Sequence, residues 1–224
     1  MEIIDYSQIK SRLEKTSENL ERNNIQSFIV DSADDVAPLI KSLICEGETV
    51  ANGGSVTLAE CGIIDLLKSG RYIYIDRNSH LLSPEQKREN EIRTFGADTY
   101  FCSSNAVTEN GELYNVDGNS NRVAAICYGP KSVIMVVGYN KIVKNIDEAI
   151  QRVKTTAAPK NCKRLSCKTF CNETGKCVSL NNENSKIADG CSSNARICCN
   201  YLISAYQRHI HRIKVILVCE ELGY

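Results

Sequence analysis

The chain of 224 residues has no net charge and no long apolar run. Its 27 lysines and arginines are balanced by 27 aspartates and glutamates, which argues against a protein that binds nucleic acid by neutralising phosphates. No apolar run reaches the ~18 residues that a membrane-spanning helix needs. The acidic start MEIIDYSQIK lacks the basic and apolar regions of a secretory signal. We therefore expect a cytoplasmic protein whose partners include no nucleic acid and no membrane.

Several familiar motifs are also missing. No Gly-Lys-Ser/Thr follows the glycine pair at Gly53 and Gly54, which excludes a Walker A loop, and the GxGxxG pattern does not occur there. None of the twelve cysteines forms a Cys-x-x-Cys pair, so neither a zinc ribbon nor a thioredoxin-like motif is matched. Any phosphate or metal chemistry in this chain must therefore use a less common arrangement.

The residues that are present alternate between strand and helix patterns. Short apolar runs predict strands at 25–30, 49–52, 72–75, 99–102, 132–138 and 213–218. Amphipathic periodicity and capping residues predict helices at 7–22, 33–46, 56–70, 119–129, 146–157 and 195–208, with a further helix starting at Ser83. The Asn110-Gly111 pair predicts a β-hairpin. This pattern indicates an α/β fold with a mostly parallel sheet and helices on both faces.

We expect one domain over residues 1–224. An N-terminal helix falls within residues 1–24. Residues 160–200 form a cysteine-rich insertion, because one more buried strand, IKVILV, follows that segment.

A first candidate site is the stretch ANGGSVTLAECG, where a strand ends and a helix begins. Unpaired backbone N–H groups and the helix dipole favour an anion at such a start. The candidate ligand-binding residues here are Gly53, Gly54, Ser55 and Thr57. The alternative is an ordinary turn whose glycines only satisfy local geometry.

A second candidate site is SSNAVTENGELYNVDGNSNR, which is rich in hydrogen-bonding side chains. Arg122 could clamp a carboxylate or phosphate with two nitrogens, and Glu109 and Asp117 are candidate general acids or bases. Candidate ligand-binding residues in the same stretch are Asn105, Asn115, Gly118 and Asn121. Because ligands bind at the carboxyl ends of parallel strands, we expect Arg122 and Asp117 to line one pocket with residues 53–57. The alternative is that Asp and Asn serve as turn and cap formers.

Seven of the cysteines fall between Cys162 and Cys199. In a reducing compartment such a group favours a metal or iron–sulfur site over reactive thiols, and both over disulfides. The five remaining cysteines are predicted to be small core residues, at Cys45, Cys61, Cys102, Cys127 and Cys219.

The stretches GGSVTLAECGI, SNAVTENGELYNVDGNSNRVAA, RIC at 196–198 and VILVCEELGY resemble the lactate-utilisation (LUD) domain family. The resemblance implies a fold similar to ribose-5-phosphate isomerase and the CoA transferases. Larger relatives take part in lactate oxidation within iron–sulfur protein complexes. For this short, cysteine-rich chain it implies four metal ligands, Cys171, Cys177, Cys191 and Cys198. Phe170 stands where short relatives carry proline, and thirteen residues separate Cys177 from Cys191.

Two functions remain open at this stage. One is a lactate-utilisation-like protein with a cysteine-bound metal centre, an iron–sulfur cluster, that serves organic-acid redox metabolism with redox partner proteins. The other is an isomerase- or transferase-type enzyme that acts on a small phosphorylated or carboxylated metabolite and carries structural zinc. In both, the ligand is a small anionic metabolite. Fold alone does not choose between an enzyme and a non-catalytic subunit.

Overall fold

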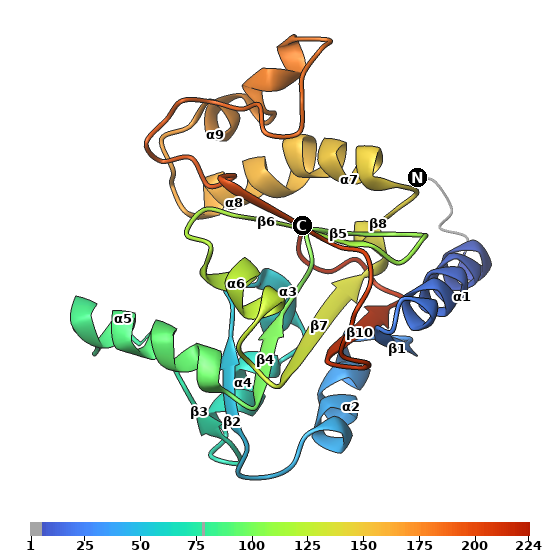
Figure 1. Cartoon of the computed structure of the whole chain (residues 1–224), viewed down its shortest axis with the longest axis vertical. Helices are drawn as coiled ribbons and strands as arrows, with labels where there is room; N and C mark the ends of the chain where they lie inside the picture. Colours follow the sequence, from blue (N-terminus) through green and yellow to red (C-terminus); the bar gives the residue numbers. More distant parts are fainter. Residues whose placement is uncertain (1–5, 78) are drawn as a thin grey trace.

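The computed structural model describes residues 6–77 and 79–224 and has an α/β architecture with two sheets (Figure 1). The main sheet has the strand order β1-β10-β7-β4-β2-β3, and all of its neighbouring strands are parallel. Its strands are β1 (Gln26–Val30), β2 (Thr49–Asn52), β3 (Ile73–Tyr74), β4 (Thr99–Cys102), β7 (Ser132–Gly138) and β10 (Ile213–Val218). The predicted parallel sheet is confirmed.

A second, four-stranded sheet lies next to the carboxyl ends of the main strands (Figure 1). Its order is β8-β5-β6-β9, with β5 (Ala106–Thr108), β6 (Leu113–Asp117), β8 (Ile142–Val143) and β9 (Asn200–Ser204). The predicted hairpin joins β5 to β6, and Gly111 in its turn has a φ of 87° that favours glycine. The links from β4 to β5 and from β7 to β8 are short, which holds the two sheets together.

Helices cover both faces of the main sheet. One face packs against α1 (Tyr6–Arg22) and α6 (Asn121–Cys127), and the other against α2 (Val36–Leu43), α3 (Val56–Glu60) and α4 (Ile63–Lys68). The alternation of side chains along β4 shows the two faces, because Tyr100 and Cys102 join the first core and Phe101 joins the second. Helix α5 (Pro84–Arg93) begins at the predicted Ser83–Gln86 capping box and buries no side chain among its own residues.

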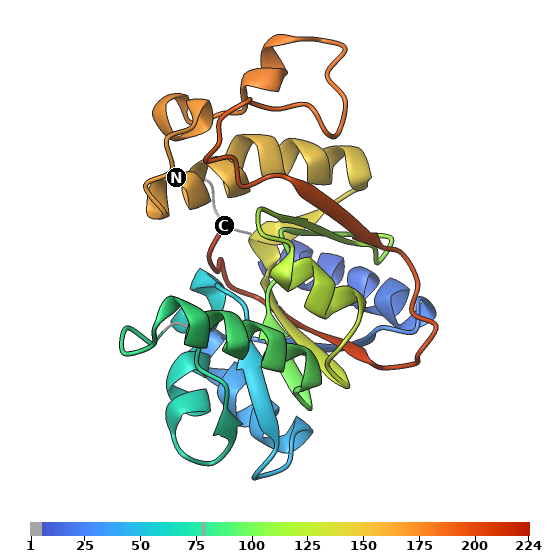
Figure 2. The ribbon, with the colours of Figure 1, turned by 60° about the vertical axis from the view of Figure 1, so that its left-hand side comes forward.

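A third layer covers the second sheet. Helix α7 (Ile146–Arg152) continues through a π-helical turn (Val153–Ala157) into α8 (Ala158–Arg164). Ala149, Val153 and Ala157 pack with Ala106 and Tyr114 of the second sheet into a small core. The cysteine-rich segment predicted at residues 160–200, called the cysteine segment below, contains α9 (Phe170–Thr174). Most of it lies beyond this layer, at the top of Figures 1 and 2.

Some sequence predictions are wrong. Residues 200–204 form strand β9 rather than part of a helix at 195–208, because they pair with β6 in antiparallel register. The helix predicted at 56–70 is divided at Gly62, whose φ of 66° interrupts the helical backbone between α3 and α4. Cys45 and Cys127 are exposed rather than core residues, whereas Cys61, Cys102 and Cys219 are buried as expected.

Among the described residues, no helix combines the length and the apolar character needed to cross a membrane.

Gly138, at the end of β7, allows the C-terminal segment to pass very close to the sheet. A Cβ added there would lie 2.6 Å from both the Glu220 carbonyl oxygen and the Leu222 amide nitrogen. We expect Gly138→Ala to lower the free energy of unfolding by about 1–3 kcal/mol, the usual cost of overpacking. Urea unfolding followed by circular dichroism would measure this. Gly96→Ala is the matched control, since a Cβ there meets nothing within 4 Å, and an equal loss in both variants would contradict the prediction.

Candidate functional site

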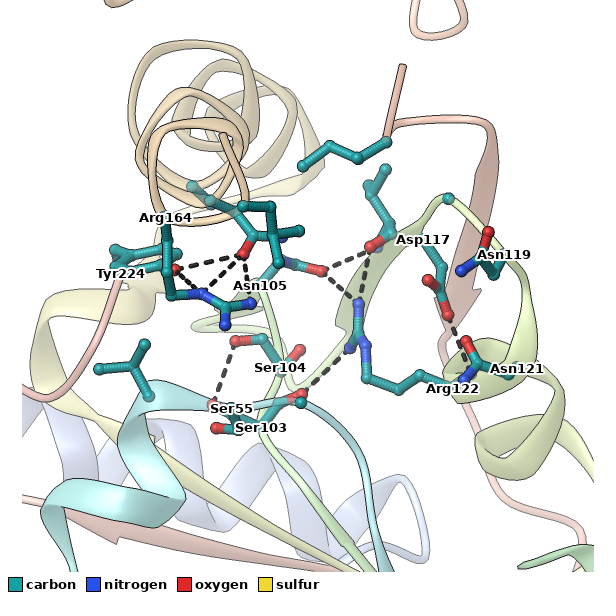
Figure 3. A pocket seen from close by; sticks show the side chains of 18 of the residues that line it. Ser55, Ser103, Ser104, Asn105, Asp117, Asn119, Asn121, Arg122, Arg164 and Tyr224 are labelled. Carbon is teal, nitrogen blue, oxygen red and sulfur yellow. Dashed lines mark hydrogen bonds between the residues drawn. The ribbon is translucent and has the colours of Figure 1, made fainter. Parts of the chain in front are cut away.

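A cavity of about 500 Å³ lies at the carboxyl ends of the main strands (Figure 3). Gly54–Thr57 follow β2, Ser103–Asn105 follow β4, and Lys141 follows β7. Because β2, β4 and β7 are neighbours in the sheet, their three connections meet at one edge. This is where open α/β sheets place their ligands.

The opposite wall comes from the second sheet and the helices above it. Asp117, Gly118 and Asn121 line the cavity where β6 turns into α6. Arg164 of α8 and residues 194–197 of the cysteine segment complete this wall. The structure therefore brings Arg122 and Asp117 to the same cavity as the turn after β2, as the sequence predicted.

The lining is strongly cationic. Among the described residues, its charged side chains are one carboxylate, Asp117, and four arginines, and the amine of Lys141 lies beside them. The arginines are Arg77, Arg122, Arg164 and Arg196. Such an imbalance creates a positive potential inside a partly enclosed space, which attracts small anions.

Arg122 is bound mainly by the protein itself. Its Nη1 donates to the Ser103 carbonyl at 3.1 Å and to Asn115 Oδ1 at 2.6 Å. Its Nη2 donates to Asn105 Oδ1 at 2.8 Å and to the Val116 carbonyl at 2.7 Å. These four bonds occupy both terminal nitrogens, so Arg122 holds the connection after β4 against β6, and the two-nitrogen clamp expected from the sequence is directed at protein acceptors (Figure 3).

Asp117 is tied to the start of α6. Its Oδ2 accepts the backbone N–H groups of Arg122 at 2.9 Å and Val123 at 3.2 Å. These bonds satisfy two of the N–H groups that a helix start leaves unpaired. Asp117 lines the cavity, but one of its oxygens already has this structural role.

The turn after β2 contributes surface rather than an anion cradle. Helix α3 has only five residues, and the Ser55 hydroxyl already accepts the Leu58 N–H as a cap. Gly54, Ser55 and Thr57 line the cavity, whereas Gly53 is packed beneath it. A Cβ at Gly53 would lie 2.7 Å from the Tyr100 hydroxyl and 3.3 Å from Arg122 Cδ.

Two further candidate residues do not line the cavity. Asn115 is fully buried, and it positions Arg122 through its Oδ1. Glu109 lies at the β5–β6 hairpin, where it forms ion pairs with Arg12 at 2.7 Å and Lys15 at 2.9 Å on α1. These cations hold the pKa of the Glu109 carboxyl below its usual value. Glu109 therefore ties α1 to the hairpin, away from the cavity.

Two arginines that sequence reasoning did not select have donors to spare. Arg77 forms an ion pair with Glu91 at 3.4 Å, and its Nε is buried without a partner among the described residues. Arg164 Nε donates to the Tyr224 hydroxyl at 2.7 Å, and its Nη2 donates to Asn161 Oδ1 at 2.8 Å (Figure 3). Within the described part of the chain, Arg77 Nη2 and Arg164 Nη1 have no acceptor, so each of these arginines has a donor that a ligand could use.

Lys141 is the lysine of the lining, and its surroundings differ from those of the arginines. Its side chain is almost fully buried, and its Nζ donates to Thr57 Oγ1 at 2.7 Å and Ser103 Oγ at 3.0 Å. Burial, followed by the nearby Arg152, lowers the pKa of the amine to about 7. The only sequence signal for it was its place directly after a buried strand, since a single lysine matches no motif.

The four predicted metal ligands come together at a separate, small cavity of about 20 Å³. Cys171, Cys177, Cys191 and Cys198 all line it. Within the described residues, however, no three Cys, His, Asp or Glu side chains are placed so that they could hold a metal ion. The donor type suits a soft metal or a cluster, but the thiols of the described residues do not have a metal-binding arrangement. Cys162, not selected as a ligand, lies with its sulfur 3.6 Å from that of Cys171.

Comparisons with known proteins agree with this architecture. A model of the LUD domain family matches residues 13–218. The solved structure of a DUF162 family protein from Deinococcus radiodurans is similar over 94% of this chain and 98% of that one, with a TM-score of 0.51 and 15% identity. No curated protein matches the sequence.

Two further solved structures resemble parts of the chain. The eIF2B beta protein of Chaetomium thermophilum has a TM-score of 0.34 and 18% identity. The similar region covers 52% of this chain and 41% of the eIF2B beta chain. The malonate decarboxylase alpha subunit of Acinetobacter baumannii has a TM-score of 0.34 and 13% identity. The similar region covers 62% of this chain and 35% of that subunit. The similarity to the DUF162 family protein shows the fold, whereas the similarities to these two structures are too weak to support any conclusion.

The pKa of Lys141 predicts a pH-dependent contribution to stability. Arg152 and Arg122 lower this pKa while Glu60 and Cys61 raise it, and burial keeps it at about 7 against 10.5 in the unfolded chain. Between these values the unfolded chain binds the extra proton, so the contribution of this group to stability rises with pH, by up to about 1.4 kcal/mol per unit. We expect Lys141→Met to be most stabilising, relative to wild type, at or below neutral pH, and this advantage to shrink toward pH 10. Chemical unfolding of both proteins at several pH values would measure it, and a pH-independent difference would contradict it.

Proposed function

The chain belongs to the LUD domain family, and we propose that it binds a small organic anion in the cavity between its two sheets. The family membership supports a lactate-utilisation-like protein, so the ligand class we infer is a small organic acid of the kind that such metabolism handles. A cavity of about 500 Å³ is in the size range of small-molecule sites.

The observation that carries this proposal is the unmatched positive charge of the lining. Four arginines face one carboxylate, and the Lys141 amine lies beside them. Among the described residues, Arg77 Nη2 and Arg164 Nη1 have no acceptor. A carboxylate or phosphate could accept from these two groups and offset the repulsion between the arginines.

The alternative, an isomerase- or transferase-type enzyme for a phosphorylated metabolite, uses the same cations. A carboxylate ligand and a phosphate ligand differ in charge and size, so their relative affinities separate the two proposals. Preference for lactate or another small carboxylate supports the organic-acid function. Preference for a sugar phosphate supports the alternative.

We expect Arg77→Gln and Arg164→Gln each to weaken anion binding by about tenfold or more, because a hydrogen bond to a charged group contributes roughly 1.5–3 kcal/mol. Isothermal titration calorimetry with lactate, pyruvate and ribose 5-phosphate would measure this. Arg88→Gln is the matched control, since Arg88 is exposed on α5 and does not line the cavity. The proposal fails if both cavity variants bind every probe as tightly as the control does.

A second candidate function, a cysteine-bound iron–sulfur or zinc centre, is supported by the shared position of Cys171, Cys177, Cys191 and Cys198. Burial raises the pKa of the Cys198 thiol, Arg196 offsets part of this increase, and the neighbouring Cys177 and Cys191 raise the pKa further. Thiolates gathered there would repel one another, so a bound cation or cluster would stabilise the group. This centre would use cysteine thiolates as its protein ligands, and it would serve redox chemistry as a cluster or a structural role as zinc.

Replacement of a ligand should release the metal. We expect Cys177→Ser and Cys198→Ser to retain roughly a tenth or less of the metal held by the wild-type protein. Elemental analysis for iron and zinc, with a visible absorption spectrum after anaerobic purification, would show which metal is present. Cys45→Ser is the control, because Cys45 is exposed and lies outside this cavity. Equal metal content in all the variants, or none in the wild type, would contradict the proposal.

A further inference from the structure

Lys141 has features that simple anion binding does not require. It ends a short 3-10 turn (Tyr139–Lys141) directly after β7, so its side chain reaches across the carboxyl ends of the neighbouring strands. Thr57 follows β2 and Ser103 follows β4, and both hydroxyls meet the Lys141 Nζ. An arginine or an exposed lysine would supply positive charge with less loss of hydration.

The hydrogen bonds around this nitrogen suit a neutral amine. Thr57 Oγ1 donates to the Leu222 carbonyl at 3.4 Å, and Ser103 Oγ donates to the Ser104 carbonyl at 3.4 Å. Each hydroxyl therefore has a carbonyl to which it can donate, at a long distance, and can accept one N–H from Lys141. Two acceptors satisfy the two N–H groups of a neutral amine and leave its lone pair unused, whereas an ammonium has a third N–H to place.

The surroundings also favour the neutral form. The Lys141 side chain is 2% exposed and, among the described residues, forms no ion pair with a carboxylate. Two arginines, Arg152 and Arg122, add repulsion to any charge on it. Burial and a neighbouring cation are the two ways in which proteins activate a lysine as a nucleophile.

We propose that Lys141 is a nucleophilic amine that forms an imine with a small carbonyl compound whose carboxylate or phosphate group is held by Arg77 and Arg164. This inference rests on the anion-binding function and extends it to one chemical class of ligand. The lone pair of Nζ forms a bond to the carbonyl carbon, and the C=O π electrons move to the oxygen, which takes up a proton. Loss of water, with both amine protons leaving the nitrogen, gives the C=N bond. The step needs no oxidant or reductant.

Three features place the two parts of such a ligand. Lys141, Arg77 and Arg164 line the same cavity, and the last two have donors that no described residue occupies. The hydroxyls of Thr57 and Ser103 accept from Nζ and so hold the amine in position at the edge of the cavity. Gly223 keeps this corner compact, because a Cβ there would lie 2.5 Å from Thr57 Oγ1 and 3.3 Å from Nζ.

Reductive trapping tests this inference on the wild-type protein. The protein is incubated near pH 7.5 with pyruvate or dihydroxyacetone phosphate and cyanoborohydride, and the labelled lysines are mapped by peptide mass spectrometry. Only on the order of one in a thousand ordinary lysine amines is neutral at that pH, so we expect Lys141 to be labelled at least about a hundredfold faster than exposed lysines. Labelling by pyruvate alone indicates a 2-oxo acid, and labelling by dihydroxyacetone phosphate alone indicates a phosphorylated ligand.

Three controls make the result specific. Acetone carries the carbonyl without an anion, and labelling of Lys141 by acetone as fast as by both anionic probes would overturn the role of the arginines. Lys154, the matched control, is also buried but lies outside the cavity, where its Nζ donates to Ser185 Oγ and the Lys186 carbonyl, and it should stay unlabelled. Lys141→Met should lose the adduct while circular dichroism confirms that it is folded.

The outcomes separate this inference from the function on which it rests. Calorimetric binding of the same probes with no adduct on Lys141 would overturn the imine and leave anion binding intact. If the probes neither bind nor label Lys141, both the imine and the anion-binding function are overturned. Uniform labelling of exposed lysines, with Lys141 no faster than the others, would also overturn the inference.

Discussion

The guanidinium of Arg122 connects the end of β4 to strand β6 of the second sheet, and this connection forms part of the cavity wall. Its two terminal nitrogens bind the Ser103 carbonyl and the Asn105 side chain after β4, and the Asn115 side chain and Val116 carbonyl on β6. Each bond to this cation contributes roughly 1.5–3 kcal/mol, and loss of the arginine would leave several buried acceptors unpaired. Gly53 lies close below it, since a Cβ added at this position would be 3.3 Å from Arg122 Cδ.

This hydrogen-bonded wall holds positive charge at the cavity. Cations that repel one another normally turn toward water, but here Arg122 and Arg196 are held by protein acceptors. Burial lowers the pKa of the Lys141 amine to about 7, which reduces its share of the repulsion. The same arrangement thus places fixed positive charge from arginines beside an amine that loses its proton easily.

Local sequence patterns were enough for the main sheet but not for the second one. Strands such as 132–138 are wholly apolar, the Ser83–Gln86 cap is a short-range signal, and Asn110-Gly111 marks a tight hairpin. Strand β9 was mistaken for a helix because its pairing with β6 joins residues 200–204 to 113–117, and no local pattern encodes such a distant partner. Propensity within the segment was overruled by this tertiary contact.

The candidate site shows the same division. The turn at 54–57 and the polar run at 117–122 were visible because several suitable residues adjoin in sequence. Arg77, Lys141 and Arg164 are single residues on separate elements, and only the fold reveals that they line one space. For Lys141 a rule was available, because a charged residue directly after a buried parallel strand falls at the edge where ligands bind.

Arg196 makes the two candidate sites physically dependent on each other. It lines the anion cavity, while its Nε donates to the Cys198 carbonyl at 2.9 Å and its Nη1 to the Cys191 carbonyl at 3.3 Å. A third set of bonds, from Nη2 to the Ala188 carbonyl at 2.7 Å and the Tyr201 hydroxyl at 3.0 Å, fixes its head group. A backbone shift at Cys191 or Cys198 that moves these carbonyls would therefore also move a cation of the anion cavity. A ligand held partly by Arg196 would in turn favour one arrangement of Cys191 and Cys198, because coupling between two sites is reciprocal.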